Sequence, residues 1–439
     1  MPGAHPVSVQ SFDFGELFTL SARPVIAGAV QRGLEFYFDY GSPPNRVAGD
    51  AQAFRRGIYR ILSAASQVLE AGVLILSGEI GPGPEPGTVS LRVDAAASGL
   101  RSDDAGIDAV LAGLELEKDA ADPSLPHVVT ARGTCPVLGG DVLYRCVPSA
   151  GVLFSLLMTC EGEVREELRP PDAHGCSALI LHGGDQSAHG LSRRLQRFGW
   201  HVHQFESVEA FADAVASDTC PHRLAVAIAS EGVDVDTLVR LNALTASVTP
   251  GSVDLIHAVR AGSPVLGATP PSGWDFRVVP FLPSEIWDFT RRADPDASGV
   301  HQESRPTPLA STSRPRVLVV DDDEVNRIIA SGLLQMIGYD TLSACSGDEA
   351  IAMCRRVSPD AVLMDINMPG LDGYQATAVL KRLQKAGGIP PFPIIAATAA
   401  GTQARSMEQG LDGHLSKPLL ADDLRLQLHR ALKGLATGL

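Results

Sequence analysis

A short apolar run that ends in three carboxylates constrains this 439-residue chain more than any other feature. Residues Val317–Val320 are continuously apolar, and Asp321, Asp322 and Asp323 follow them directly. A run without polar alternation is typical of a central strand in a parallel sheet, which is buried on both faces. In open α/β sheets the binding crevice lies beyond the carboxyl ends of such strands. We therefore expect these carboxylates to line a crevice.

The same pattern recurs where Leu363 and Met364 precede Asp365. If both runs are strands of one parallel sheet, Asp365 meets Asp321 and Asp322 at the same edge. Three carboxylates in one pocket repel one another unless a divalent cation lies among them, and Mg²⁺ prefers a few such oxygens. The sequence therefore predicts a Mg²⁺ site.

Strand-like and helix-like runs alternate through residues 316–439 and again through residues 174–292. Alternation of this kind predicts two doubly wound parallel sheets of the (βα)5 type. The apolar runs of residues 174–292 correspond to those of residues 316–439: Leu224–Ile228 corresponds to Ala361–Met364, and Ser263–Thr269 corresponds to Phe392–Thr398. An internal duplication is the simplest account.

The remaining parts of the chain differ from this repeat. Residues 1–165 combine two long helical patterns, at Phe14–Arg32 and Gln52–Ala71, with antiparallel-looking strands, which favours an α/β sandwich. Residues 293–315 are rich in Pro, Ser and Thr and are expected to form a linker.

Composition disfavours several classes of protein. A formal net charge of −15, without any run of Lys and Arg, argues against partners such as nucleic acid or a membrane surface. The seven cysteines are odd in number and lack C-x-x-C spacing, so we expect buried thiols rather than disulfides or a zinc site. No run of about 18 apolar residues and no signal-like N-terminus is present, which predicts a cytoplasmic protein.

Four spaced motifs in the C-terminal part resemble the response-regulator receiver domain. They are Val-Val-Asp-Asp-Asp at 319–323, Met-Asp-Ile-Asn-Met-Pro at 364–369, Ala-Ala-Thr at 396–398 and Leu-Ser-Lys-Pro at 415–418. The resemblance implies a flavodoxin-like fold for residues 316–439. It also implies that Asp365 is the phosphoacceptor, a carboxylate nucleophile that takes a phosphoryl group from a phosphohistidine. The implied Mg²⁺ ligands are Asp321, Asp322, Asp365 and the main-chain carbonyl of Asn367.

A carboxylate that attacks a phosphoryl group brings two anions together, so a cation must neutralise the developing charge. By the resemblance, Lys417 supplies this cation and Thr398 a hydroxyl donor. Pro418 resembles the family's cis-proline, which would fix the direction of the ammonium group. His414 stands where the family usually has an aromatic switch residue. We expect switching at Thr398 and His414 that is either weaker or pH-dependent, because imidazole titrates near neutrality; an exposed surface histidine is the alternative.

The middle repeat, residues 174–292, resembles a receiver without its chemistry. Aligned by the predicted strands, the residues at the positions of Asp321, Asp322, Asp365, Lys417, Thr398 and Pro418 are His182, Gly183, Ala227, Val279, Thr269 and Pro280. We therefore expect a pseudoreceiver that is not phosphorylated. His182, His201 and His203 have no carboxylate or cysteine partner and are expected to be surface histidines rather than metal ligands.

Residues 1–165 resemble the ATP-binding domain of histidine kinases, through the helix at Gly49–Gln67. In that helix Arg60, Ala64 and Gln67 replace the family's two asparagines and its lysine. Ala95 stands where the family has an adenine-binding aspartate, and Asp94 is expected to face the other side of its strand. We expect a degenerate ATPase-type domain that binds no nucleotide.

These resemblances predict a protein like a hybrid histidine kinase whose only chemistry is phosphorylation and autodephosphorylation of Asp365. Its phosphodonor would be a histidine kinase or a histidine phosphotransfer protein, and it would signal by contact with a downstream protein, since no output domain follows. Two alternatives remain open, an active hybrid histidine kinase and a phosphorylation-independent adaptor. The identity of the partners and the formation of a homodimer also remain open.

Overall fold

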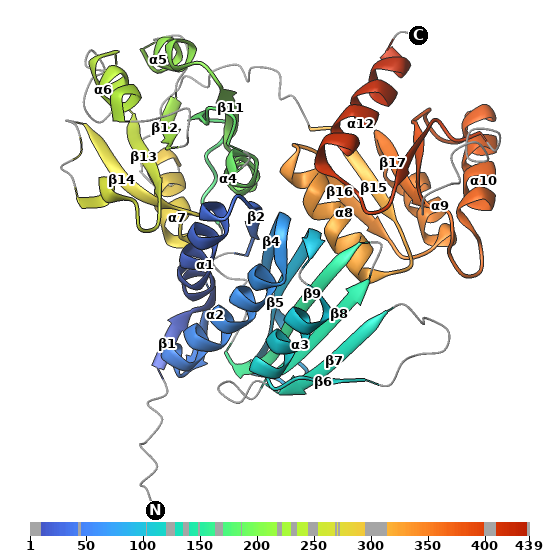
Figure 1. Cartoon of the computed structure of the whole chain (residues 1–439). Helices are drawn as coiled ribbons and strands as arrows, with labels where there is room; N and C mark the ends of the chain where they lie inside the picture. Colours follow the sequence, from blue (N-terminus) through green and yellow to red (C-terminus); the bar gives the residue numbers. More distant parts are fainter. Residues whose placement is uncertain are drawn as a thin grey trace, which may run out of the picture.

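A computed structural model gives the fold of the chain. It describes residues 10–42, 45–101, 103–119, 128–134, 140–147, 150–162, 170–185, 187–216, 222–229, 235–244, 253–267, 270, 273–294, 314–398 and 410–436. The strands form one seven-stranded sheet, two five-stranded sheets and one two-stranded sheet. Figure 1 shows the seven-stranded sheet below the two five-stranded ones. Across the described residues, no helix is both long and apolar enough to cross a bilayer.

The N-terminal part is an α/β sandwich, as expected. Its large sheet has the order β2-β4-β5-β9-β8-β7-β6, in which only β2 and β4 pair in parallel. The strands are β1 (Gln10–Asp13), β2 (Glu35–Tyr40), β3 (Arg46–Gly49), β4 (Leu69–Pro82), β5 (Thr88–Arg101), β6 (Glu117–Lys118), β7 (Val129–Thr134), β8 (Asp141–Val147) and β9 (Gly151–Glu161). The helices are α1 (Phe14–Gln31), α2 (Ala51–Gln67) and α3 (Asp104–Gly113).

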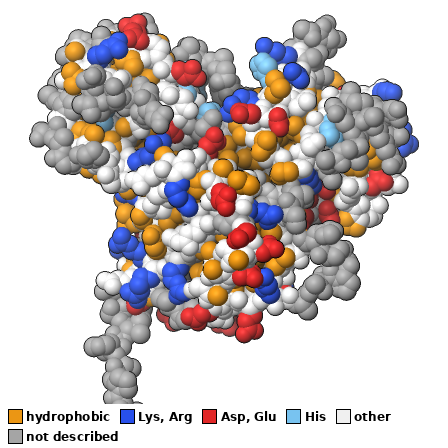
Figure 2. All heavy atoms as spheres, viewed as in Figure 1, with side chains coloured by type: hydrophobic (Ala, Val, Ile, Leu, Met, Phe, Trp, Pro, Cys, Tyr) orange, Lys and Arg blue, Asp and Glu red, His pale blue; other side chains and the backbone are white. Residues whose placement is uncertain are grey.

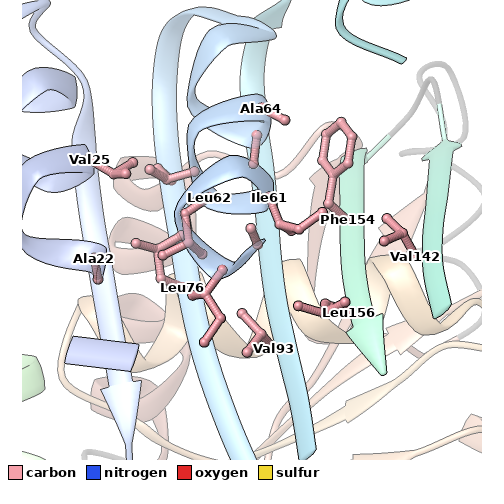
Figure 3. Close-up of a cluster of buried hydrophobic side chains, with 14 of the residues drawn as sticks. Ala22, Val25, Ile61, Leu62, Ala64, Leu76, Val93, Val142, Phe154 and Leu156 are labelled. Carbon is pink, nitrogen blue, oxygen red and sulfur yellow. The ribbon is translucent and has the colours of Figure 1, made fainter. Parts of the chain in front are cut away.

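The helices of the sandwich cover one face of the sheet. Asp13 and Asp50 cap α1 and α2 by accepting hydrogen bonds from the first-turn backbone N–H groups, which otherwise lack partners. Figure 3 shows Ile61 of α2 beside Phe154 of β9, with Leu62 of the same helix toward Leu76 of β4. The second predicted helix ends four residues early, at Gln67, because the apolar residues that follow continue into β4.

The middle and C-terminal parts each contain a parallel five-stranded sheet of the same topology. The strand orders are β11-β10-β12-β13-β14 and β16-β15-β17-β18-β19, which confirms the expected repeat of one receiver-like architecture. The middle elements are β10 (Ser177–Leu181), α4 (Ser187–Gln196), β11 (His201–Phe205), α5 (Val208–Ala216), β12 (His222–Ile228), α6 (Val235–Leu244), β13 (Asp254–Arg260), the 3₁₀ turn η1 (Pro264–Gly267), β14 (Trp274–Val279) and α7 (Pro283–Ala293).

The C-terminal elements are β15 (Arg316–Val320), α8 (Glu324–Met336), β16 (Asp340–Ala344), α9 (Gly347–Arg356), β17 (Ala361–Asp365), α10 (Gly373–Lys385), β18 (Ile394–Thr398), β19 (Gly413–Ser416) and α12 (Ala421–Ala436). In both repeats the last strand is followed by a cis peptide bond before proline, at Val279–Pro280 and at Lys417–Pro418. The cis geometry expected for Pro418 is therefore confirmed. Most of the predicted linker, residues 293–315, lies outside the described residues.

Two details of the predicted alignment between the repeats are wrong. The fourth strand of the middle sheet is Asp254–Arg260, whereas Pro264–Gly267 of the predicted strand forms a 3₁₀ turn. A proline cannot donate to a strand ladder, whereas Asp254–Arg260 pairs in parallel with both β12 and β14. Val259 therefore occupies the position of Thr398, and Thr269 lies outside the described residues.

The second error is a shift of one residue. Leu181 pairs with Ala227 as Val320 pairs with Met364, so Ile228 rather than Ala227 corresponds to Asp365. The substitution is still apolar, and the conclusion that no carboxylate stands there is unchanged.

The environments of several single residues also differ from expectation. Cys146 and Cys354 are buried free thiols, but Cys345 is exposed, so burial is not general among the described cysteines. His182 is buried rather than on the surface, and its Nδ1 accepts a hydrogen bond from the backbone N–H of Gly184.

On the face shown in Figure 2, Lys and Arg side chains lie among Asp and Glu side chains.

The buried His257 on β13 is expected to make the stability of the fold depend on pH. Its ring is fully buried, stacks on Trp274 at 4.0 Å, and has no hydrogen-bond partner for either nitrogen among the described residues. Burial lowers the pKa of His257 to about 4. The unfolded chain then binds a proton that the folded chain does not between pH 6.5 and 4, so acidification through this window destabilises the fold, by about 3 kcal/mol when complete.

Replacing His257 by Phe should remove this part of the acid dependence, because an apolar ring can occupy the same stack without titrating. The free energy of unfolding of both proteins is measured by tryptophan fluorescence during denaturant unfolding, at pH 7.5 and at pH values below 6.5. Equal losses of stability in both proteins between these pH values would contradict the expectation.

The second face of the N-terminal sheet packs against the C-terminal domain. One apolar cluster contains Ile75 and Leu153 of the sheet together with Ile329 and Leu333 of α8. At Gly332 the helix approaches so closely that a Cβ atom would lie 2.7 Å from Ile75 Cδ1. In Figure 1, α8 accordingly lies between the N-terminal sheet and the strands of the C-terminal sheet.

Candidate functional site

Parallel pairing brings the predicted carboxylates together at one edge of the C-terminal sheet. β15 lies beside β17, with Val320 opposite Met364, so both strands end at the same level. Asp321, Asp322 and Asp365 each offer an oxygen, and these oxygens lie within 4.8 Å of one another. Asp321 and Asp365 are buried, whereas Asp322 is exposed at the mouth.

Lys417 reaches this cluster from the end of β19. Its Nζ lies 2.6 Å from Asp321 Oδ2 and 3.2 Å from Asp365 Oδ2, and all three side chains are less than a tenth exposed. The Lys417 backbone N–H donates to the Thr398 carbonyl at 2.7 Å, and the cis peptide to Pro418 follows directly. The cation is therefore held between the two buried carboxylates from a neighbouring strand end.

The charges in the pocket shift one another's protonation. Burial, opposed by Lys417 and reinforced by Asp321, raises the pKa of Asp365 to about 6. Burial tends to lower the pKa of Lys417, but Asp321 and Asp365 outweigh it and raise that pKa above its ordinary value. Burial and the neighbouring Asp321 also raise the pKa of Asp322. These directions are those of an anionic pocket that lacks enough positive charge.

The structure adds residues that the sequence analysis did not single out. Asp321 Oδ1 accepts from the side-chain amide of Asn326 at 2.9 Å and from the backbone N–H of Asp323 at 3.0 Å. Arg327 Nη1 donates to the backbone carbonyls of Asp321 and Asp322 at 2.8 and 2.9 Å. Their position in the sequence could have identified them, because Asn326 and Arg327 lie in the first turn of the helix that follows the acidic run.

Thr398 and His414, the expected switch pair, are in contact. Thr398 Oγ1 lies 2.8 Å from His414 Nε2, and Thr398 is 1% exposed. His414 is only partly exposed, so the alternative of a free surface histidine is wrong. Burial lowers the pKa of His414 below its ordinary 6.5. Its titration is therefore expected below that value rather than at neutral pH.

The donor set fits a hard divalent cation. Asp321, Asp322 and Asp365 form a cluster typical of a Mg²⁺ site, since Mg²⁺ takes carboxylate oxygens and retains water. The three carboxylates share one lysine, Lys417, so their negative charges outnumber its positive charge. A bound Mg²⁺ would neutralise oxygens of a transferring phosphoryl group.

Comparison with known proteins agrees with this geometry. The family model of the response regulator receiver domain matches residues 317–429. Protein PilH of Pseudomonas aeruginosa is 32% identical over 119 residues, which cover 27% of this chain and 98% of PilH. Through this domain, the chain belongs to the response regulator receiver family. The pocket described above is accordingly the acidic pocket of a receiver domain.

Sequence similarity to one sensor histidine kinase extends beyond the receiver domain. Sensor histidine kinase GacS of Pseudomonas protegens is 24% identical over 404 residues, covering 87% of this chain and 42% of that kinase. The chain thus spans less than half the length of this relative. A crystal structure of full-length ShkA in complex with AMPPNP covers 98% of this chain and 86% of its own, at 19% identity and a TM-score of 0.38.

The corresponding edge of the middle sheet has a different chemistry. His182 and Gly183 follow β10, and Ile228 and Val279 stand where the receiver domain has its phosphoacceptor candidate and its lysine. An ion pair between Arg260 Nη2 and Asp185 Oδ2, at 2.6 Å, joins the ends of β13 and the loop after β10. Among the described residues, the only group of three or more side chains that could hold a metal is the one in the receiver domain.

Proposed function

We propose that this chain is a phosphorelay protein that accepts a phosphoryl group on Asp365. The donor is a histidine kinase or a histidine phosphotransfer protein, and the output is contact with a downstream protein. The observation that carries the proposal is the position of Lys417 between the buried Asp321 and Asp365, beside the exposed Asp322. A carboxylate pocket with one fixed cation and an open mouth suits transfer of a dianionic phosphoryl group.

In the proposed reaction an Asp365 carboxylate oxygen forms a bond to phosphorus while the phosphorus–nitrogen bond of the donor histidine breaks. The imidazole keeps that electron pair and leaves with the donor. Lys417 holds Asp365 in place and balances the charge that accumulates on the phosphoryl oxygens, and Thr398 donates its hydroxyl to one of them. Asp321, Asp322, Asp365 and the Asn367 carbonyl would hold Mg²⁺. Movement of Thr398 and the contacting His414 would then signal the phosphorylated state.

We further propose that residues 1–165 are a degenerate kinase ATP-binding domain and that residues 174–292 are a pseudoreceiver, joined by the linker 293–315 to the receiver domain at 316–439. Two contacts support the loss of nucleotide binding. Arg60, which replaces a family asparagine, donates to the Gly113 carbonyl at 2.6 Å and so ties α2 to the end of α3. Asp94 faces the opposite side of the sheet from α2, where it accepts from Ser155 and Arg92.

The full chain is therefore expected to show no saturable heat on titration with ATP and Mg²⁺ up to about 1 mM, the upper range of ordinary substrate affinities. Isothermal calorimetry makes the measurement, and a titration with Mg²⁺ alone supplies the baseline for the receiver domain. Saturable binding of ATP, or labelling of the chain by γ-labelled ATP, would favour the alternative of an active hybrid kinase.

A phosphorylation-independent adaptor is the second alternative. It differs from the proposal in one respect, because partner binding would not depend on Asp365. Recovery of the same partners by wild type and by Asp365→Ala, after exposure to a phosphodonor, would favour it.

A further inference from the structure

The N-terminal domain contacts the receiver domain at the turn that carries the metal-site carboxylates. Arg145 on β8 pairs with Asp323, with Nη2 2.6 Å from Oδ2, and the two side chains are 25% and 14% exposed. Arg92 on β5 pairs with Glu324 at 2.8 Å and also with Asp94 at 2.7 Å. Both receiver acids directly follow Asp321 and Asp322 in sequence.

Asp323 links this interface to the pocket. Its Oδ1 accepts from the backbone N–H groups of Val325 and Asn326 and so caps α8, while its Oδ2 takes the Arg145 guanidinium. The Asp323 backbone N–H donates to Asp321 Oδ1, and Lys417 donates to Oδ2 of the same Asp321 carboxylate. A continuous series of polar contacts therefore runs from Arg145 through Asp323 and Asp321 to the lysine beside Asp365.

The middle domain provides an internal comparison. It also presents the first helix of its fold, α4, to the N-terminal domain, where Arg197 pairs with Asp39 at 2.7 Å. At the position of Asp323, however, it has Gly184, and no charge from the N-terminal domain can reach its turn through that residue. A receiver-like domain can thus dock onto the N-terminal domain without an ion pair equivalent to Arg145–Asp323. The pair occurs in the repeat that retains the acidic pocket.

We propose that Arg145 is a positioning residue of the receiver pocket, supplied by the N-terminal domain, and that it sets the pocket's affinity for Mg²⁺. Arg145 compensates Asp323, the third carboxylate of the turn, and fixes the conformation of residues 321–326. By reciprocity, occupancy of the pocket and docking of the N-terminal domain are coupled. The inference rests on the proposed function, because it names a regulator of the same pocket, but it concerns cation binding and does not need phosphotransfer to occur.

The test is a charge cycle on the full chain, with the Mg²⁺ dissociation constant measured by calorimetry. Arg145→Gln leaves Asp323 uncompensated and should tighten Mg²⁺ binding about threefold, while Asp323→Asn, which keeps an N-cap, should weaken it about threefold. The double variant restores the net charge and should return to within about twofold of wild type. Arg145→Lys, which keeps the charge, should also stay within about twofold.

Arg132→Gln is the matched control, since Arg132 lies on the adjacent strand, is 73% exposed and pairs with Asp119 of its own domain. It should leave the Mg²⁺ dissociation constant unchanged. A lower melting temperature of Arg145→Gln with an unchanged Mg²⁺ dissociation constant would overturn the proposal, because it would show a structural contact only. A Mg²⁺ dissociation constant of the double variant that differs from wild type by clearly more than about twofold would likewise overturn it. Failure of the proposed function would appear separately, as wild type that binds Mg²⁺ but is not labelled.

Discussion

Replacement of Asp365 by Ala is expected to lower labelling by a small phosphodonor, such as acetyl phosphate with Mg²⁺, by about a thousandfold or more. Asp365 is one of the two buried carboxylates that contact Lys417, and its loss removes the atom to which phosphorus would bind in the proposed reaction. The fold should survive, because removal of one of three crowded carboxylates relieves repulsion. Intact-mass spectrometry, which detects the added phosphoryl group, measures the result.

Asp348→Ala is the matched control for this experiment. Asp348 is an exposed acid in the first turn of α9 of the same domain, outside the pocket. This variant should be labelled at the wild-type rate. Labelling that persists in Asp365→Ala while its melting temperature equals that of wild type would show that another residue accepts the phosphoryl group.

Replacement of Lys417 by Met is expected to slow labelling about 10²- to 10³-fold, the effect of removing one group that stabilises developing charge. The side chain stays long and apolar, so the change mainly removes the cation that lies 2.6 Å from Asp321 and 3.2 Å from Asp365. Without Lys417 the pKa of Asp365 should rise further above its value of about 6. On acidification, Asp365 of the variant should therefore become protonated, and labelling should be lost, at a higher pH than in wild type.

The same variant should bind Mg²⁺ more tightly, because the competing ammonium group is gone. Opposite changes in cation affinity and in labelling rate distinguish this role from simple unfolding, which would weaken both. Lys381→Met is the control: Lys381 on α10 pairs with Asp412 of the same domain, away from the carboxylate cluster. Equal labelling rates for Lys417→Met and Lys381→Met would refute a role for Lys417 in charge stabilisation.

Much of this structure follows from local sequence patterns. The uninterrupted apolar runs before Asp321 and Asp365 form buried parallel strands, and period-two alternation correctly places Asp94 on the face of β5 opposite α2. One error concerns the fourth strand of the middle repeat. Pro264–Gly267 resembled a strand, but the ladder partners of β12 and β14 are in Asp254–Arg260, and pairing between strands is a long-range property.

By itself the sequence determined the two receiver-like repeats and the acidic cluster, because strand period and strand-end position place these residues whatever surrounds them. The lysine of the cluster was expected from the resemblance to receiver domains. Only the tertiary structure decided that the N-terminal sheet packs on α8 and that Arg145 reaches Asp323. These residues are 178 positions apart. No local pattern records which face of one domain meets another, since docking depends on the joint shape and charge of two folded surfaces, such as the missing Cβ at Gly332 opposite Ile75.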